Sequence, residues 1–298
     1  MKKYLMTSLK GFGMGAANVV PGVSGGTIAL LTGIYGELLE AINSVTKKET
    51  WTALRSRQWK AFWKEIHGSF LLSLAIGVLV SVLSLAKLML FVLTNYPVQT
   101  WAFFFGLIIA SALIMFRSVK GWGVSEVLFV IFGAALGVWV STLNALSNTP
   151  DDLWYIFLCG VISICTMILP GVSGSFILVV LGKYDYIMQA LDVTAFNIPV
   201  LLAFGVGCLV GILAFAKFLN WLLARWEKQT LLVLLGFILG SLVKVWPWSN
   251  TEALLEAGVV TDVAQLSTFP MWEWAALWAV LGVILVVGLE YFSTKVSK

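Results

Sequence analysis

The pentapeptide Pro-Gly-Val-Ser-Gly occurs twice in this 298-residue chain, at 21–25 and again at 170–174. The flanking residues recur too, at an offset of 149 residues near the motif and of 130 farther on: Gly33, Tyr35, Gly77, Lys87, Gln99, Thr100, Gly106 and Ser111 correspond to Gly182, Tyr184, Gly207, Lys217, Gln229, Thr230, Gly236 and Ser241. The pattern predicts two copies of one unit, over 1–146 and 147–298. In a membrane protein, matched Gly/Pro interruptions in two halves point to a binding site.

Composition indicates a membrane protein. Hydrophobic residues make up 60% of the chain and charged residues 11%, whereas about a quarter of a soluble domain is charged. Lys10 and Gly11 interrupt the first apolar stretch, so we expect no cleaved signal peptide. Cys159, Cys165 and Cys208 all lie in apolar runs, which favours buried hydrophobic roles over a disulfide or metal framework.

Six stretches are long and apolar enough to predict membrane-spanning helices: 68–94, 100–117, 124–146, 198–226, 229–246 and 272–292. The motif segments, 5–45 and 152–192, each predict an apolar helix, a Pro-Gly-containing break and a second apolar helix. Their short or glycine-rich legs favour a re-entrant hairpin, and two thin full crossings are the alternative. Either way, each repeat changes orientation an odd number of times. We therefore expect an all-α polytopic fold of two inverted-topology repeats, each a hairpin plus three transmembrane helices.

Charge gives an independent prediction of orientation. With the N-terminus inside, 15 of the 19 basic residues fall on cytoplasmic segments, in agreement with the positive-inside rule. We therefore expect both termini in the cytoplasm. The basic, tryptophan-rich segment 47–65 predicts an amphipathic helix on the anionic cytoplasmic leaflet. Because this segment is short and tethered at the bilayer, we expect no nucleic-acid partner.

The repeated break predicts an internal polar site, because unpaired backbone groups are tolerated at membrane depth only inside protein or beside a wet cavity. Ser24 and Ser173 are candidate N-caps of the second legs, and the amides that begin those legs suit a phosphate or carboxylate. Asn18 is expected either to satisfy freed backbone groups or to touch the ligand. The alternative is that the small residues only support tight helix packing. The candidate substrate-binding residues at the breaks are Asn18, Pro21, Gly22, Ser24, Gly25, Gly26, Thr27, Pro170, Gly171, Ser173, Gly174 and Ser175.

Ionisable residues within the apolar segments give further candidates. Lys87 and Lys217 are a matched pair inside long apolar helices, so they either supply counter-charge to a bound anion or extend toward the headgroups. Glu37, Glu40 and Asp185 lie on the second legs of the motif segments. They are candidates for coupling a proton or cation to transport, and the alternative is that they mark the return of the chain to water.

Enzymatic readings have little support in the sequence. The single histidine, His67, excludes a membrane phosphatase that needs one histidine as nucleophile and a second as acid. No Cys/His/carboxylate cluster has metal-ligand spacing, and no nucleotide-binding loop appears, so we expect no metal and no cofactor. Glycine-rich faces near 133–137 and 205–211 suit either internal packing or contacts in a homo-oligomer.

The stretches 18–27 and 169–176, with the Gly-Lys-Tyr at 182–184, resemble the bacterial polyprenyl-phosphate transporter family. The resemblance covers essentially the whole chain and rests on both motifs in order. It implies a multi-pass protein of the bacterial cytoplasmic membrane that moves undecaprenyl phosphate, the carrier lipid of cell-wall and peptidoglycan synthesis, from the outer to the inner leaflet. The phosphate head would lie between the two motif tips while access alternates between leaflets.

Two other functions remain open at this point. A small-anion channel or exchanger would use the same paired helix N-termini, and a continuous aqueous pore would favour it. A scaffold without transport activity would use the hairpins for packing alone, and it would tolerate Ser24→Ala and Ser173→Ala.

Overall fold

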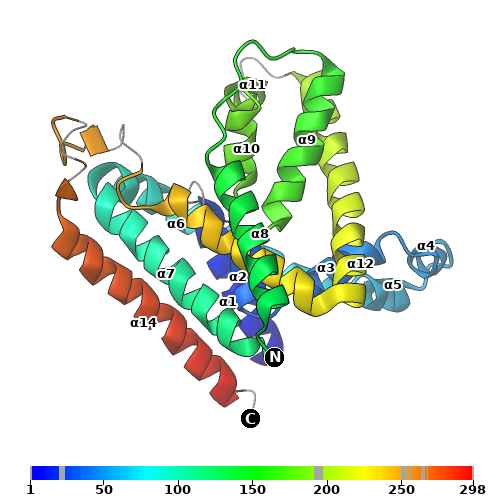
Figure 1. Cartoon of the computed structure of the whole chain (residues 1–298). Coiled ribbons are helices and arrows are strands. Elements are labelled where there is room, and N and C mark those ends of the chain that lie inside the picture. Colours follow the sequence, from blue (N-terminus) through cyan, green and yellow to red (C-terminus); the bar gives the residue numbers. More distant parts are fainter. Residues whose placement is uncertain are drawn as a thin grey trace. The chain divides into compact units, whose positions relative to one another are not determined.

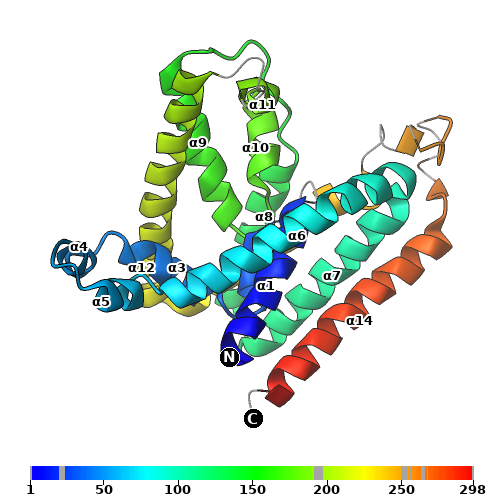
Figure 2. The same ribbon diagram turned by 180° about the vertical axis from the view of Figure 1, so that it is seen from behind.

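The computed structural model is built of α-helices (Figure 1, and from behind in Figure 2). It describes residues 2–19, 24–190, 197–249, 254–255, 257–262, 266 and 268–296. The helices of the first half are α1 (Lys2–Val19), α2 (Gly25–Leu31), α3 (Tyr35–Ser44), α4 (Lys48–Arg55), α5 (Trp59–Glu65), α6 (Gly68–Asn95), α7 (Pro97–Ser118) and α8 (Val124–Ser141). Those of the second half are α9 (Leu153–Ile168), α10 (Gly174–Val180), α11 (Tyr184–Ala190), α12 (Ile198–Val245) and α14 (Trp272–Val296).

The long helices agree with the sequence prediction. Four of them among the described residues, α6, α7, α8 and α12, are long and apolar enough to span a membrane, and α14 carries an apolar stretch over Trp272–Gly288. Helix α12 joins two predicted helices, with non-helical backbone at Trp226 between them (φ −139°, ψ 56°). The predicted helix 124–146 is too long at its end: α8 stops at Ser141, and the next residues form a loop.

The motif segments differ from the prediction, because each second leg is two short helices. In the first segment α2 ends before Gly33 (φ +71°) and α3 follows it; in the second α10 ends before Gly182 (φ +65°) and α11 follows it. Glycine takes this left-handed conformation without the steric cost that other residues meet, so it commonly ends helices. Helices α2 and α10 have seven residues each and rise only about 10 Å.

The chain forms two compact units, and each combines parts of both sequence repeats. One unit contains Met1–Val82 and Leu143–Thr230, and the other contains Leu83–Thr142 and Leu231–Lys298. Both motif segments belong to the first unit.

Glycine contacts within the first unit follow the sequence repeat. A Cβ added at Gly11 would lie 2.4 Å from the Leu74 carbonyl oxygen, so α1 and α6 touch closely there. A Cβ added at Gly160 would likewise lie 2.4 Å from the Phe204 carbonyl oxygen, so α9 and α12 touch closely there. Both residues of the second pair are displaced from the first by the repeat offsets, so the two copies pack their helices through equivalent positions.

The second unit has a matching pair of glycine contacts. A Cβ at Gly133 of α8 would lie 2.1 Å from the Val233 carbonyl oxygen of α12. A Cβ at Gly282 of α14 would lie 2.2 Å from the Phe103 carbonyl oxygen of α7, and both views show α7 and α14 side by side. Of the two roles predicted for the glycines near 133–137, the structure shows internal packing.

Gly207→Ala is expected to destabilise the protein, whereas Gly205→Ala two residues earlier on α12 is not. A methyl at Gly207 would lie 2.2 Å from the Phe157 carbonyl oxygen, while Gly205 has nothing within 4 Å. Overpacking of this kind costs about 1–3 kcal/mol, because backbone must move. Thermal unfolding of the two purified variants in detergent measures the difference. Equal melting temperatures would show that α9 and α12 are not in close contact here.

Candidate functional site

The tip of the first motif segment, of which the structure describes residues 24–27, is buried and hydrogen-bonded within the segment. Ser24 caps α2, and its Oγ accepts a hydrogen bond from the Gly26 amide at 3.1 Å. Asn18, at the end of α1, accepts a hydrogen bond from the Gly25 amide at 2.7 Å through Oδ1. Asn18 therefore takes the first of its two predicted roles, satisfying a freed backbone group. The Gly25 and Gly26 amides therefore already have acceptors within the first motif segment.

The tip of the second segment is organised differently. Ser173 occupies the N-cap position of α10, as predicted, but its side chain makes no capping hydrogen bond, unlike that of Ser24. Its Oγ lies 2.6 Å from the Oγ of Ser175, whose side chain is exposed. Ser163 of α9 donates to the Gly174 carbonyl oxygen at 3.0 Å. The second tip therefore presents a pair of hydroxyl groups, one of them on an open face.

The two tips are in direct contact, although 143 residues separate Ser24 from Met167 along the chain. The Ser24 hydroxyl donates to the Met167 carbonyl oxygen at 3.1 Å, and the Gly171 amide donates to Thr27 Oγ1 at 2.8 Å. Side chains of the first motif thus satisfy the carbonyl and amide groups that the break after α9 frees. Burial of Ser24 and Thr27, each 1% exposed, makes these bonds structurally important.

A third bond across the tips comes from Tyr35, which the sequence identified as a repeat landmark and not as a site residue. Its hydroxyl donates to the Ile168 carbonyl oxygen at 3.2 Å, and its side chain is 3% exposed. The counterpart Tyr184 is exposed, so the repeat alone could not assign this role. The first motif segment therefore supplies three side-chain partners to the backbone around the break in the second.

Close contact explains one difference between the two motifs. A Cβ at Gly26 would lie 2.4 Å from the Ile168 carbonyl oxygen, so only glycine fits there without movement. The corresponding residue of the second motif is Ser175, whose side chain is exposed. The two positions therefore differ because Gly26 lies against the backbone of the second segment, whereas Ser175 lies on an exposed face.

The proline and remaining glycine residues of the motifs are only partly described. Pro21 and Gly22 lie outside the described residues. Pro170 and Gly171 are buried at the break after α9, where Gly171 has a φ of +103° that favours glycine.

The charged candidates are not members of this cluster of buried polar contacts. Lys217 of α12 is exposed, and Lys87 of α6 is exposed in the second unit. Glu40 and Asp185 are exposed as well, and Glu37 lies 3.6 Å from the Lys3 ammonium. The structure shows no hydrogen bond from any of these five residues to the described tip residues.

Two side-chain donors that were not predicted as site residues bond to the C-terminal ends of the short helices α2 and α10. Lys10 Nζ donates to the Thr32 carbonyl oxygen at 2.7 Å, at the C-cap of α2. The Tyr155 hydroxyl donates to the Leu181 carbonyl oxygen at 3.1 Å, at the C-cap of α10. Because Thr32 and Leu181 differ by the repeat offset, both copies hold the same carbonyl with a side chain from their first helix, using different chemistry.

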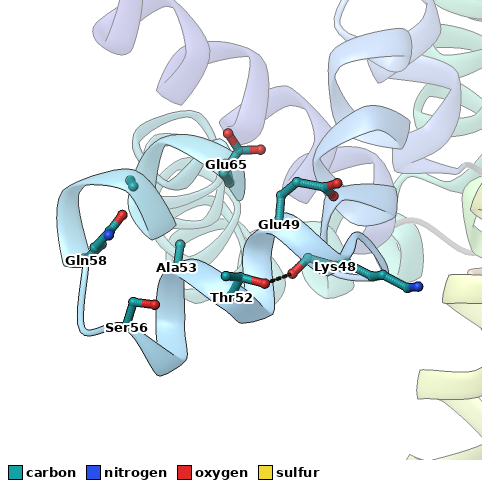
Figure 3. A pocket seen from close by; sticks show the side chains of 8 residues that line it. Lys48, Glu49, Thr52, Ala53, Ser56, Gln58 and Glu65 are labelled. Atoms are coloured by element: carbon teal, nitrogen blue, oxygen red, sulfur yellow. Dashed lines mark hydrogen bonds between the residues drawn. The ribbon is translucent and has the colours of Figure 1, made fainter.

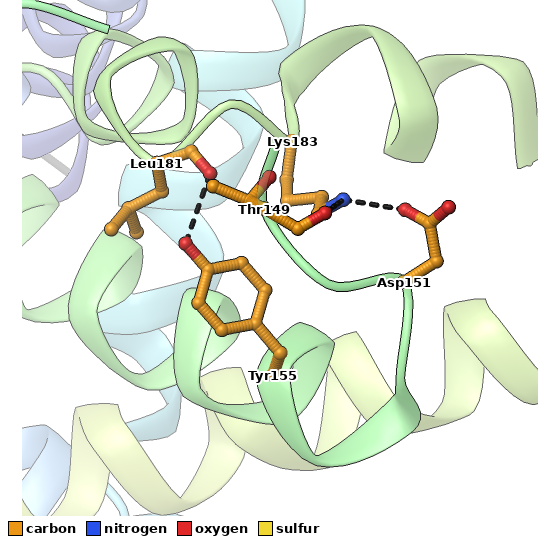
Figure 4. Close-up of polar contacts among 5 residues, drawn as sticks. All are labelled: Thr149, Asp151, Tyr155, Leu181 and Lys183. Carbon is orange, nitrogen blue, oxygen red and sulfur yellow. Dashed lines mark hydrogen bonds and ion pairs between the residues drawn. The ribbon is translucent and has the colours of Figure 1, made fainter. Parts of the chain in front are cut away.

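A buried lysine lies beside the second of these ends (Figure 4). Lys183 Nζ lies 2.5 Å from Asp151 Oδ1 and donates to the Thr149 carbonyl oxygen at 3.0 Å. The rings of Tyr155 and Tyr186 lie 5.8 and 5.1 Å from the same nitrogen. Lys183, in the turn between α10 and α11, thereby bonds to two residues of the loop before α9. These bonds lie at the end of the second motif segment that is opposite its tip.

Asp151→Ala is expected to lower the stability by about 1–2 kcal/mol, because it leaves a lysine that is 4% exposed without its carboxylate. The effect stays modest since the Asp151 side chain is 65% exposed and solvent screens the pair. Adding Lys183→Met to Asp151→Ala removes the stranded charge, so the double variant should recover part of the loss. A double-mutant cycle of melting temperatures tests this, and purely additive effects would contradict a direct pairing.

Comparison with known proteins assigns the chain to a family. A family model described as undecaprenyl phosphate translocase-like matches residues 14–261. The polyprenyl-phosphate transporter of Vibrio cholerae serotype O1 is 39% identical over 310 aligned residues, covering 98% of both chains. The polyprenyl-phosphate transporter of Staphylococcus aureus is 32% identical over 262 residues, covering 83% of this chain and 88% of its own. No solved structure matches the chain. The family resemblance carried by the paired motifs is therefore confirmed, and this chain belongs to the undecaprenyl phosphate translocase-like family.

Proposed function

We propose that this protein moves undecaprenyl phosphate from the outer to the inner leaflet of the bacterial cytoplasmic membrane, as a transporter and not as an enzyme. Two relatives named polyprenyl-phosphate transporters, similar over most of their length, support the substrate class. The spanning helices support a membrane location. Both termini lie in the cytoplasm in this proposal, because that orientation best satisfies the positive-inside rule.

The observation that carries the proposal is the contact of two broken helices through buried polar groups. Thr27 and Gly171 join the tips by a hydrogen bond, and the exposed Ser175 lies beside Ser173 at the same place. Ser24 and Thr27 satisfy freed backbone groups, whereas the described contacts of the Ser173 and Ser175 hydroxyls are only to each other, so this pair can serve a polar ligand. The chain's polar motif thus matches a lipid whose only polar part is a compact phosphate.

In this proposal the two tips have different roles. The first tip, with its amides satisfied by Ser24 and Asn18, supports the second by bonding to its backbone. The second tip receives the phosphate through the hydroxyls of Ser173 and Ser175, while the polyprenyl tail stays in the lipid. Movement of the hairpins relative to each other then exposes the head group to one leaflet after the other.

Binding of undecaprenyl phosphate to the purified protein tests this function, with undecaprenol and inorganic phosphate as controls. We expect the phosphorylated lipid to bind at least about tenfold more tightly than undecaprenol, since a charge-assisted hydrogen bond contributes about 1.5–3 kcal/mol. Equal binding of inorganic phosphate would favour a small-anion channel or exchanger. Equal binding of undecaprenol would refute a site for the phosphate head.

A further inference from the structure

The segment between the first motif and α6 folds as a helical hairpin, not as the single amphipathic helix that the sequence predicted. Helices α4 and α5 are joined by a turn in which Arg57 has a φ of +53°. The α4 helix is attached to the rest of the unit: Thr50 Oγ1 donates to the Ser44 carbonyl oxygen at 2.7 Å, and Thr50 and Ala53 are buried.

Helix α5, by contrast, has no buried residue. Its apolar side chains Trp59, Phe62 and Trp63 fall on one face, and the two tryptophans are 63% and 44% exposed. A seven-residue helix is marginal by itself in water, so it needs a surface against which to pack. The side that faces α4 borders an open cavity of about 350 Å³ (Figure 3), and Trp59, Phe62 and Trp63 are not among the residues that line it, so α4 does not cover these aromatic side chains.

The charge of the hairpin indicates what kind of surface that is. Residues 47–65 contain six basic and two acidic side chains, a net charge of +4. All six basic side chains are exposed: Lys47, Lys48, Arg55, Arg57, Lys60 and Lys64. Exposed tryptophan beside exposed lysine is the composition of helices that lie in the interface of an anionic membrane.

Chain connectivity sets the place of α5 independently of its composition. Helix α5 ends at Glu65 and α6 begins at Gly68, and the apolar part of α6 that can span the membrane is Gly68–Leu85. Three residues reach at most about 10 Å, so α5 must lie close to the membrane surface at which α6 enters. The indole N–H of Trp63 donates to Ser69 Oγ at 3.0 Å, which ties α5 to the first turn of α6.

We propose that the α4–α5 hairpin is a binding surface for anionic phospholipid headgroups. The apolar side chains Trp59, Phe62 and Trp63 insert at the level of the headgroups, and the surrounding basic side chains attract the lipid phosphates. This surface is separate from the tips and recognises the bilayer around the protein. The proposal does not depend on which lipid is transported.

Hydrogen exchange of the full-length protein in lipid nanodiscs tests the proposal. The discs contain phosphatidylcholine alone or mixed with phosphatidylglycerol, and the readout is the protection of the amides of α5. We expect the wild-type protein to gain protection when phosphatidylglycerol is present. Each basic residue at an anionic surface strengthens the attraction roughly fivefold, so Lys60→Gln/Lys64→Gln should lower that protection by up to about 25-fold.

The matched control is Arg117→Gln/Lys120→Gln, which removes one exposed charge from the last turn of α7 and one from the connection to α8. It should leave the protection of α5 unchanged. Trp59→Ala/Phe62→Ala should lower protection in both kinds of disc, because it removes the inserted groups. Protection of α5 that is the same with and without phosphatidylglycerol would overturn the proposal. Protection that appears only when two copies share a disc would overturn it in favour of a contact between copies.

Discussion

Gly26→Ala is expected to separate the two motif tips and to abolish most of the transport activity. The added methyl would lie 2.4 Å from the Ile168 carbonyl oxygen and 3.2 Å from that of Met167, both of them backbone atoms. Neither can move without displacing the end of α9, so we expect a loss of about 1–3 kcal/mol in stability. The same displacement lengthens the hydrogen bond that Ser24 donates to Met167 and the one that Thr27 accepts from Gly171. Because the proposed head-group site depends on the contact between the tips, transport should fall together with the melting temperature.

Gly36→Ala is the matched control, because it adds the same methyl to the first motif segment at a position where the new Cβ has no neighbouring atom within 4 Å. It should change neither the melting temperature nor the transport of undecaprenyl phosphate into liposomes that contain the reconstituted protein. If Gly26→Ala behaved like Gly36→Ala in both measurements, the close contact between the tips would be absent from the working protein.

Ser173→Ala/Ser175→Ala is expected to weaken the binding of undecaprenyl phosphate about 100-fold with little change in stability. Each hydroxyl can donate to an anionic oxygen, and such a charge-assisted bond contributes about 1.5–3 kcal/mol. The hydroxyls lie 2.6 Å apart and Ser175 is exposed, so their removal leaves no buried carbonyl unsatisfied. Lipid binding and melting temperature measured on the same preparation separate the two effects.

Ser24→Ala/Thr27→Ala provides the contrast. These two side chains are buried and bond to the backbone around the second break, so their loss should lower the melting temperature first. Their effect on lipid binding should be indirect and should follow the loss of stability. A stable Ser24→Ala/Thr27→Ala protein that had lost binding would instead move the head-group site to the first tip.

The sequence predicted the helices well because their signal is simple. Apolar runs of the length needed to cross a bilayer are unambiguous, and the break within α12 coincides with the polar residues around Trp226. The end of α8 was predicted five residues too late because residues 142–146 remain mostly apolar. There the Leu146 amide donates to the Val180 carbonyl oxygen, a tertiary contact that periodicity cannot reveal.

The division of each second leg could have been predicted but was not. Gly33 and Gly182 were recognised as equivalent, and a repeated glycine at the end of a short apolar run is a common helix C-cap. The cross-tip bond of Tyr35 had no such signal, because Tyr184 at the equivalent position is exposed. Repeats in sequence indicate which positions correspond, and unequal packing then decides which member of a pair is used.

Photo-cross-linking tests the central claim most directly. The probe is a polyprenyl phosphate that carries a photoreactive group next to the phosphate, added to the full-length protein in membranes. The account predicts that labelled peptides contain the second tip, residues 173–176, and that Ser173→Ala/Ser175→Ala abolishes this label while Gly36→Ala leaves it intact. Labelling confined to the second compact unit, or labelling of the tip that is indifferent to both serines, would contradict it.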